Sequence, residues 1–170
     1  MLGIPVQFTN RFERWFHNAA CVTFVNTPSH KKELEEIGIK KLALWSRGID
    51  ENIFSPTPSD RNNSYYLYVG RVSKEKNLES FLSLKLDKKK VVVGGGPSLK
   101  SLKKKYPDVE FLGYKFGREL AEIYSNACVK VFPSRTDTFG IVMIEANACG
   151  TPVAGYPVTG PIDVVKNGVN

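Results

Sequence analysis

Two carboxylates, Asp137 and Glu145, stand in the segment SRTDTFGIVMIEANACG with seven residues between them. Asp137 lies in a loop after a strand-like run. Phe139 and Gly140 then open a helix whose first-turn N–H groups can bind an anion such as a phosphate. Residues 139–148 are apolar almost all round, which is typical of a buried helix. Glu145 is the exception, and a buried carboxylate needs a partner.

The helical face that carries Glu145 has no side chain able to pair with its carboxylate. That face consists of Ile141, Val142, Ala148 and Cys149. Two neighbouring hydroxyls of a ligand, such as those of a ribose, would suit the carboxylate, and we favour this interpretation. The alternative is a structural bond to a backbone amide or to a lysine or arginine elsewhere in the chain.

A second group of candidate residues lies in the segment YVGRVSKEKN. A strand-like run ends at Gly70, Arg71 follows at once, and Lys76 opens the next helix. Two cations at the carboxyl end of a parallel strand can neutralise a diphosphate that gains negative charge as it leaves. The alternative is a pair of solvated loop residues, with Lys76 bonded to Glu75 or Glu79, and this segment alone favours neither.

The segment VVVGGGP places three glycines, Gly94 to Gly96, between a strand-like run and Pro97. Such a segment can bring the backbone close to a ligand, and it can equally be a tight turn into a helix. A dinucleotide-binding fingerprint would need glycine in place of Leu99, and a P-loop would need a lysine and a hydroxyl that are absent here. The segment therefore argues against an NAD-dependent oxidoreductase and against hydrolysis of ATP or GTP.

Strand-like and helix-like segments alternate along the chain, which indicates right-handed βαβ crossovers and a parallel sheet. The strand-like runs are nearly continuous in apolar residues, as expected when both faces of the sheet are covered. We predict a doubly wound α/β fold, with ligands in the crevice outside the carboxyl ends of the strands. The predicted strands are residues 21–25, 41–45, 65–70, 90–95, 109–114, 129–134 and 151–156. The predicted helices are residues 29–36, with Ser29 as the N-cap, 76–84, 98–105, 117–126 and 139–148.

The formal net charge of +7 resides in one segment. Between Lys85 and Lys105 lie eight lysines and a single acid, Asp87. Such a patch can attract anionic lipid or nucleic acid, but it has no arginine and few aromatic residues, which argues against readout of bases. We favour a solvated lysine-rich surface. Because these lysines enter a strand or end a helix, we expect them at the sheet edge opposite the ligand crevice.

Other features narrow the class of protein further. No run of eighteen apolar residues is present, and the N-terminus lacks the layout of a signal peptide. The three cysteines, Cys21, Cys128 and Cys149, are widely spaced and form neither a metal-type pair nor a disulfide framework. The only histidines are His17 and His30. We therefore expect a cytoplasmic protein without a histidine-based metal site.

The spacing of Asp137 and Glu145 resembles the E-x7-E signature of retaining glycosyltransferases of family four. Further matching motifs follow the order of that family, namely Arg47-Gly48-Ile49-Asp50 before Phe54 and Pro56, Gly70-Arg71 with Lys76, the Gly94 to Pro97 turn, Phe111-Leu112-Gly113, Phe139-Gly140 and Gly150-Thr151-Pro152-Val153. The resemblance covers most of residues 21–168. The segments SRTDTFG and GYPVTGPIDV are similar to those of bacterial members described as GDP-mannose-dependent α-mannosyltransferases.

The resemblance implies a GT-B fold, in which two Rossmann-like domains face each other across a cleft. It implies transfer of a sugar, with mannose a candidate, from a nucleoside diphosphate to a hydroxyl acceptor with retention of configuration. The expected donor is GDP-mannose or a UDP-hexose, with no further cofactor and, since no Asp-x-Asp pair occurs, no divalent metal.

The resemblance also implies roles for single residues. Arg71 and Lys76 would bind the donor diphosphate, Asp137 would lie near the hydroxyls of the transferred sugar, and Glu145 would hold the ribose. Asp137 replaces the usual glutamate and is one methylene shorter. Further donor contacts are expected from Gly70, Gly95, Tyr114 within Gly113–Lys115 beside the base, and the backbone of Phe139, Gly140, Ile141 and Val142.

The resemblance implies three parts in the chain. Residues 1–54 would be a remnant of the N-terminal, acceptor-binding domain with the interdomain connection, and residues 55–64 would be a linker. Residues 65–170 would be a donor-binding domain that is truncated at its C-terminus. We therefore expect the chain by itself to be inactive or weakly active.

The expected partners are the nucleotide-sugar donor and a glycan or lipid-linked acceptor, in the synthesis of a cell-envelope polysaccharide. Contact with anionic lipid would place the protein at the inner face of the membrane, and no nucleic acid is expected. Two alternatives stay open: a sugar-nucleotide-binding fragment without catalysis, and a basic protein that binds membranes or nucleic acid through its lysines.

Overall fold

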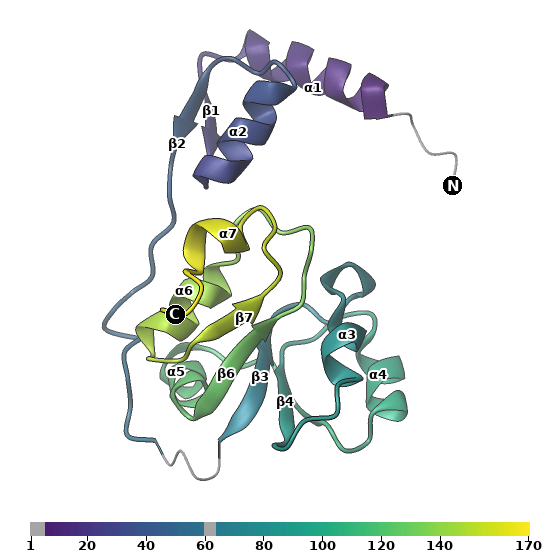
Figure 1. Ribbon diagram of the computed structural model, residues 1–170, viewed down its shortest axis with the longest axis vertical. Helices are drawn as coiled ribbons and strands as arrows, with labels where there is room; N and C mark the ends of the chain where they lie inside the picture. The colour runs from purple at the N-terminus through teal and green to yellow at the C-terminus, as the bar shows by residue number, and fades with distance from the viewer. Residues whose placement is uncertain (1–5, 60–63) are drawn as a thin grey trace. The chain divides into compact units, whose positions relative to one another are not determined.

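The computed structural model describes residues 6–59 and 64–170. The chain divides into two compact units, residues 1–47 and residues 48–170 (Figure 1). Each unit has its own parallel sheet, two-stranded in the first and five-stranded in the second. The functional candidates Arg71, Lys76, Asp137 and Glu145 all belong to the second unit.

The boundary between the units lies earlier in the chain than the predicted linker, residues 55–64. The preceding residues 48–54 group with the second unit. Phe54 packs against the core of that unit, and Arg118 donates hydrogen bonds to the carbonyl groups of Asn52 and Ile53. Of the predicted linker, residues 60–63 lie outside the described residues.

Among residues 6–47, the first unit contains two strands and two helices. Its elements are α1 (Val6–Ala19), β1 (Thr23–Val25), α2 (Pro28–Glu36) and β2 (Leu42–Leu44). Strand β1 pairs in parallel with β2. The N-cap of α2 is Thr27, whose hydroxyl accepts a hydrogen bond from the amide of His30, so the prediction of Ser29 as the cap was wrong. Pro28 lies in the first turn of α2, where its missing N–H costs nothing. The helix therefore begins at Pro28, and its cap lies two residues earlier than predicted.

The second unit alternates strands and helices throughout. Its strands are β3 (Tyr65–Val69), β4 (Lys90–Val93), β5 (Glu110–Gly113), β6 (Ala127–Phe132) and β7 (Val153–Gly155). Its helices are the 3-10 helix η2 (Lys74–Lys76), α3 (Leu78–Leu82), α4 (Leu99–Lys105), α5 (Gly117–Ser125), α6 (Ile141–Ala148) and α7 (Pro161–Val164). The predicted helix 76–84 is divided, because Asn77 adopts the left-handed conformation with a φ of 53°.

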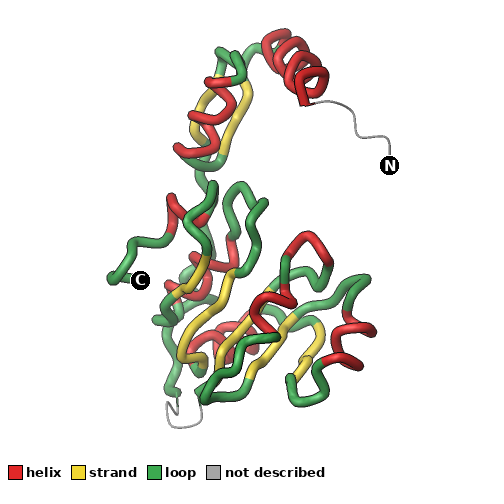
Figure 2. Tube along the Cα trace, turned by 45° about the vertical axis from the view of Figure 1, so that its right-hand side comes forward, coloured by secondary structure: helices red, strands yellow, loops and turns green. Residues whose placement is uncertain are grey.

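The five strands lie in the order β5-β4-β3-β6-β7, and every pair is parallel. Figure 2 shows strands of this sheet in yellow, side by side. The chain runs outward from β3 through β4 to β5, then returns to the other side of β3 as β6. The strand order therefore reverses between β3 and β6, and the loops that leave these two strands diverge there. In open α/β sheets a ligand binds at such a switch point. The structure confirms the predicted α/β class.

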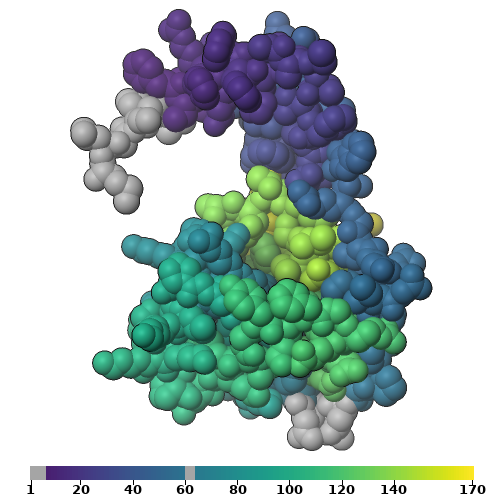
Figure 3. All heavy atoms as spheres, turned by 180° about the vertical axis from the view of Figure 1, so that it is seen from behind, coloured from purple at the N-terminus to yellow at the C-terminus, as the bar shows by residue number. Residues whose placement is uncertain are grey.

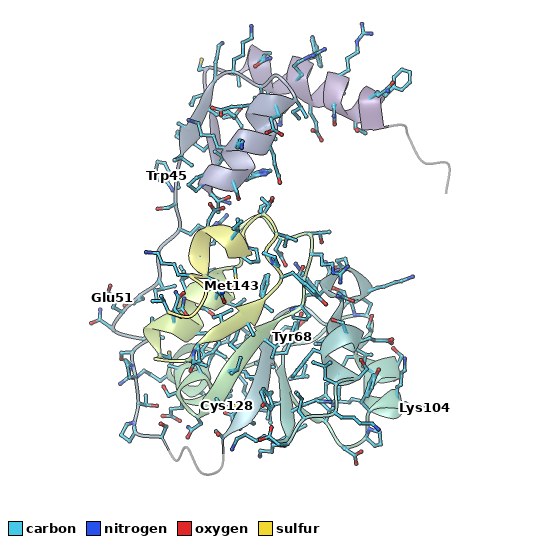
Figure 4. All side chains as sticks on the ribbon, viewed as in Figure 1. Trp45, Glu51, Tyr68, Lys104, Cys128 and Met143 are labelled. Atoms are coloured by element: carbon cyan, nitrogen blue, oxygen red, sulfur yellow. The ribbon has the colours of Figure 1, made fainter. Side chains whose placement is uncertain are left out.

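Helices cover both faces of the sheet, as the apolar strands require. On one face, Leu67 and Val91 pack with α5 and α6 through residues that include Tyr124 and Met143. On the other face, Tyr68 packs with α3 and α4 through residues that include Phe81 and Leu102. Figure 4 labels Tyr68 on β3 and Met143 on α6. The two cores hold β3 and β6 rigidly, so their exit loops start from fixed points.

Candidate functional site

The exit loops of β3 and β6 meet through an ion pair between two of the predicted site residues. Lys76, at the end of η2, donates a hydrogen bond to Asp137 with 2.5 Å between Nζ and Oδ1. Both side chains are mostly shielded, with 25% and 20% of their surface exposed. The expected alternative for Lys76, a bond to Glu75 or Glu79, is not the arrangement found: Glu79 pairs with Lys105 instead.

A second bond ties the same two loops together. The side-chain amide of Asn77 donates a hydrogen bond to the carbonyl oxygen of Pro133, at 3.1 Å. Pro133 directly follows β6, and Asn77 directly follows η2. The left-handed turn at Asn77 therefore fixes both the end of η2, which carries Lys76, and the start of the loop that carries Asp137.

Arg71 is solvent-exposed, with 67% of its side chain accessible. Its guanidinium lies 4.0 Å from a carboxylate oxygen of Glu75, and its carbonyl accepts a hydrogen bond from the hydroxyl of Tyr68. The hydroxyl of Ser73 also bonds to Glu75, and this bond is the main reason why the pKa of Glu75 is lowered. The backbone of Arg71 is held in place while its guanidinium is exposed, so the guanidinium can reach an anionic ligand without breaking a strong bond.

The glycine-rich turn after β4 is required by backbone packing. The amide of Gly70 bonds to the carbonyl of Val93, and that of Val72 bonds to the carbonyl of Gly95. A Cβ at Gly94, where φ is 120°, would lie only 2.0 Å from the carbonyl oxygen of Gly70. The exit loops of β3 and β4 therefore touch backbone to backbone, which favours the tight-turn interpretation for Gly94.

Gly95 lies under an aromatic side chain from the loop that leaves β5. A Cβ at Gly95 would lie 2.7 Å from the ring of Tyr114. Tyr114 stacks on Phe116 with the ring centroids 6.2 Å apart and the planes inclined by 6°. Both rings are largely exposed. Two predicted donor contacts, Gly95 and Tyr114, are thus adjacent, and the second offers a flat aromatic surface.

Helix α6 begins at Ile141, directly after Gly140. Gly140 has a φ of 79°, and a Cβ there would lie 2.8 Å from the side chain of Met143 and 2.9 Å from the ring of Phe132. A larger residue would push the start of the helix away from β6. The predicted backbone contacts at Phe139 and Gly140 therefore immediately precede the helix, and those at Ile141 and Val142 form its first turn.

Glu145 has a protein partner that sequence reasoning missed. Its carboxylate accepts a hydrogen bond from the hydroxyl of Tyr124, at 2.9 Å. Burial raises the pKa of Glu145, and the Tyr124 bond and the charge of Lys130 oppose this rise. The residues on the same face of its own helix cannot pair with Glu145, whereas Tyr124 belongs to a different helix, α5. One carboxylate oxygen is thus bonded inside the protein, to a tyrosine hydroxyl rather than to the backbone amide, lysine or arginine of the predicted structural alternative.

Lys130 is a second residue that was missed. It lies on β6 with its side chain fully buried, 4.3 Å above the ring of Phe132. Among the residues that the structure describes, none accepts a hydrogen bond from its amino group. Burial lowers the pKa of Lys130 to about 7, against the opposing effects of Asp137 and Glu145. The only signal in the sequence was a lone lysine inside the apolar run VKVF.

Most lysines of the segment 85–105 lie where they were expected. Lys90 begins β4, at the amino end of the strand, and its amino group bonds to the carbonyl oxygens of Leu82 and Leu84. Lys103, Lys104 and Lys105 form the last turn of α4, whereas Lys100 is the second residue of that helix, so the prediction that Lys100 also closes the helix was wrong. Figure 3 shows this segment in teal at one side of the second unit, and Figure 4 labels Lys104 on α4. The patch is therefore separate from the Lys76–Asp137 pair.

Within residues 6–59 and 64–170, every helix is too short or too polar to cross a lipid bilayer. The first unit, where α1 carries exposed aromatic side chains, contributes none of the predicted site residues. The candidate site is thus confined to the exit loops of β3 to β6 and to helix α6.

Comparison with known proteins identifies the family. The family described as "Glycosyl transferases group 1" matches residues 49–170. The chain is 34% identical over 167 residues to a GDP-mannose-dependent alpha-mannosyltransferase of Corynebacterium glutamicum, covering 91% of this chain and 40% of that protein. It is 30% identical over 171 residues to the sulfoquinovosyl transferase SQD2 of Arabidopsis thaliana, covering 89% of this chain and 34% of that protein. The chain thus spans less than half the length of these relatives.

Solved structures agree on the fold. Sucrose-phosphate synthase from Thermosynechococcus elongatus has a TM-score of 0.77 at 27% identity, covering 91% of this chain and 45% of that one. Anabaena HepE, solved in complex with UDP and glucose, has a TM-score of 0.79 at 20% identity, covering 96% of this chain and 52% of that one. The resemblance found in the motifs is therefore confirmed across most of the sequence. The chain belongs to the glycosyl transferases of group 1, the family-four type of glycosyltransferase with the GT-B fold.

Proposed function

We propose that this chain forms the donor-binding part of a retaining glycosyltransferase, which transfers a sugar from a nucleoside diphosphate to a hydroxyl acceptor. The observation that carries the proposal is the Lys76–Asp137 pair at the switch point between β3 and β6. It places a cation and a carboxylate beside the start of α6, where backbone N–H groups favour a phosphate. A sugar diphosphate needs all three features, since its phosphates are anionic and its sugar is rich in hydroxyls.

In this proposal the leaving diphosphate is stabilised by positive charge and by the N-terminus of α6. Lys76 is partly shielded from solvent, so its charge acts more strongly than that of a fully exposed lysine. Arg71 is exposed and closes on the diphosphate from outside. Such groups lower the barrier to departure because they meet the charge that develops on the leaving oxygen. The acceptor hydroxyl then attacks from the same side, assisted by the donor phosphate.

Asp137 and Glu145 take different parts of the donor. Asp137 has one carboxylate oxygen bonded to Lys76 and the other buried without a partner among the described residues, so it can accept a hydroxyl of the transferred sugar. Glu145 has one oxygen on Tyr124 and its other oxygen can accept from the ribose. Tyr114 and Phe116 offer a stacked aromatic surface for the base.

Similarity to GDP-mannose-dependent relatives supports mannose as the sugar and GDP as the nucleotide, with a UDP-hexose as the alternative donor. We propose a glycan or lipid-linked acceptor and a cytoplasmic location. The lysines of residues 85–105 would attract an anionic membrane surface by charge alone. Because the chain spans 40% of its Corynebacterium relative, donor binding without transfer is the second candidate function.

The test is a panel of thermal shifts and titration calorimetry on the full 170-residue chain with GDP-mannose, UDP-glucose, UDP-galactose and UDP-N-acetylglucosamine. We expect one donor to stabilise the wild type, and Glu145→Ala to weaken its binding. Glu122→Ala, which removes an exposed carboxylate from α5, is the matched control and should bind normally. If no nucleotide sugar binds the wild type, the donor-site proposal is wrong. A transfer assay with the donor that binds then separates an enzyme from a binding module.

A further inference from the structure

Three buried polar atoms around the end of β6 lack a hydrogen-bond partner within the described part of the chain. They are Nζ of Lys130, Oγ of Ser134 and Oδ2 of Asp137. Lys130 and Ser134 expose 0% and 2% of their surface. All three residues lie on β6 or in its exit loop, on the path from the core to the Lys76–Asp137 pair. Buried polar atoms are rarely left unbonded, so this cluster indicates that something completes it.

Burial of Lys130 costs the most free energy in this cluster, because a buried ammonium without a counter-charge is strongly disfavoured. Its position on the strand pairs it with Leu67 on β3 and Val153 on β7, both of them core residues. Neither neighbour offers a charge or a hydrogen bond from its side chain. The amino group is therefore shielded from water, and it lies 4.3 Å from the centre of the Phe132 ring.

The charged groups that act on Lys130 belong to the proposed donor site. Asp137, from the exit loop of β6, and Glu145, from α6, favour the protonated amine. Lys76, from η2, and burial itself favour the neutral amine, and together these leave the pKa of Lys130 at about 7. Glu145 itself is in contact with the hydroxyl of Tyr124 on α5, and it interacts with the buried thiol of Cys149 at the end of α6.

A bound nucleoside diphosphate would change this balance. It would place at least two negative charges beside Lys76 and the start of α6, and so offset the repulsion that Lys76 exerts on Lys130. It would also compete with Asp137 for Lys76, which leaves the carboxylate of Asp137 freer to act on Lys130. Both changes favour the ammonium form in a region that is shielded from water, where such charges interact strongly.

We propose that Lys130 is a concealed positioning residue of the donor site, whose neutral amine takes up a proton from solvent when a nucleoside diphosphate binds. The step converts the amine and one proton to the ammonium, and no other bond changes. The inference rests on the proposed function in one respect, since it takes the ligand to be a nucleoside diphosphate. It adds a coupling between donor binding and pH, and a role for a residue outside direct contact with the donor.

The experiment measures the number of protons taken up on binding. GDP and UDP are titrated into the full chain at pH 8 in buffers of different ionisation enthalpy, and the slope of apparent enthalpy against ionisation enthalpy gives that number. We expect the wild type to take up roughly half a proton more than Lys130→Met. Lys104→Met makes the same chemical change at an exposed site on α4 and should match the wild type. Equal proton uptake by Lys130→Met and the wild type would overturn the proposal.

A second measurement needs no variant, in case Lys130→Met does not fold. In the wild type, the linked proton uptake should pass through a maximum between pH 7 and pH 9.5, because Lys130 is neutral in both states at higher pH. A flat profile over this range would overturn the proposal even if GDP or UDP binds. If neither nucleotide binds the wild type at any pH, the proposed function itself fails, and the coupling fails with it. The two failures are therefore distinguishable by whether any binding heat is observed.

Discussion

Lys76 and Asp137 are 61 positions apart in the sequence, yet the Nζ and Oδ1 atoms of their side chains lie 2.5 Å apart. The contact exists because β3 and β6 are neighbours in the sheet, and each residue lies in the loop that leaves one of these strands. In the absence of a donor, the cation proposed to bind the diphosphate is held by the carboxylate proposed to bind the sugar.

Replacement of Lys76 should weaken nucleotide binding directly. We expect Lys76→Ala to raise the Kd for GDP or UDP by about tenfold or more, equivalent to ~1.4 kcal/mol, because a partly shielded cation is lost from the diphosphate. Calorimetric titration measures the change. Lys74→Ala removes an exposed lysine from the same 3-10 helix and should alter the Kd little. Equal losses in the two variants would show that only net charge matters.

Asp137→Asn should affect the affinity for the nucleotide and the affinity for the sugar differently. The amide cannot hold Lys76 as an ion pair, so Lys76 becomes free for the diphosphate and GDP should bind as well as, or a few times more tightly than, in the wild type. The amide is a poorer acceptor for sugar hydroxyls, so the gain in affinity from GDP to GDP-mannose should shrink. Titration of both ligands into both proteins gives this difference. A parallel loss of GDP and GDP-mannose affinity would assign Asp137 a purely structural role.

Tyr124→Phe should destabilise the second unit. The change removes the hydroxyl that bonds to Glu145 and leaves a half-buried carboxylate without it, at a cost of about 1–3 kcal/mol in the free energy of unfolding. Urea denaturation measures this cost. Tyr66→Phe removes a bond of similar length, from a hydroxyl to Asp87, at an exposed site and should cost much less. If the two variants lose the same free energy of unfolding, the buried hydrogen bond to Glu145 contributes no more to stability than an exposed one.

The stability of the chain should depend on pH through Lys130. Its pKa is about 7 in the folded chain, below the value of 10.5 for an unperturbed lysine. The unfolded state therefore binds more protons between these values, and the contribution of Lys130 to stability rises with pH by up to about 1.4 kcal/mol per unit. Lys130→Met should be more stable than the wild type at pH 7, and the gap should narrow toward pH 10.

Urea denaturation of the wild type and of Lys130→Met at pH 7, 8, 9 and 10 checks this sign. Other groups that titrate in the alkaline range contribute equally to both proteins, so the difference between them isolates Lys130. A difference that does not change with pH would mean that Lys130 has an ordinary pKa, and that its amino group reaches solvent in the free chain.

Gly94→Ala should disrupt the contact between the exit loops of β3 and β4. The new Cβ would lie 2.0 Å from the carbonyl oxygen of Gly70, at a φ of 120° that side chains rarely adopt. We expect a loss of at least about 2 kcal/mol in the free energy of unfolding, since both the clash and the conformation are unfavourable. Gly48→Ala is the control, because nothing lies within 4 Å of its added Cβ. A small loss at Gly94 would mean that the loops separate easily.

The alternation of strands and helices and the location of the charged residues could be read from the sequence. Apolar strand-like runs such as KVVV, separated by stretches of helical length, predicted a parallel sheet covered on both faces, because only such a sheet buries every strand side chain. The exit loops of parallel strands lie at one edge, so the loops of Arg71 and Asp137 were expected at the ligand crevice, and the lysines around Lys90 were expected at the opposite edge. These inferences depend on local pattern and on general rules of topology.

The tertiary structure alone decided which side chains meet. Strand order places β6 beside β3, and this pairing creates the Lys76–Asp137 contact. The partner of Glu145 came from another helix, because helix packing brings together residues that no periodicity within one helix can reveal. The full burial of Lys130 depends on its neighbours on both adjacent strands. The sequence thus determined the fold class and predicted the kind of site and the edge of the sheet where it lies. The charge balance within the candidate site follows from contacts between distant segments, which only the folded chain brings together.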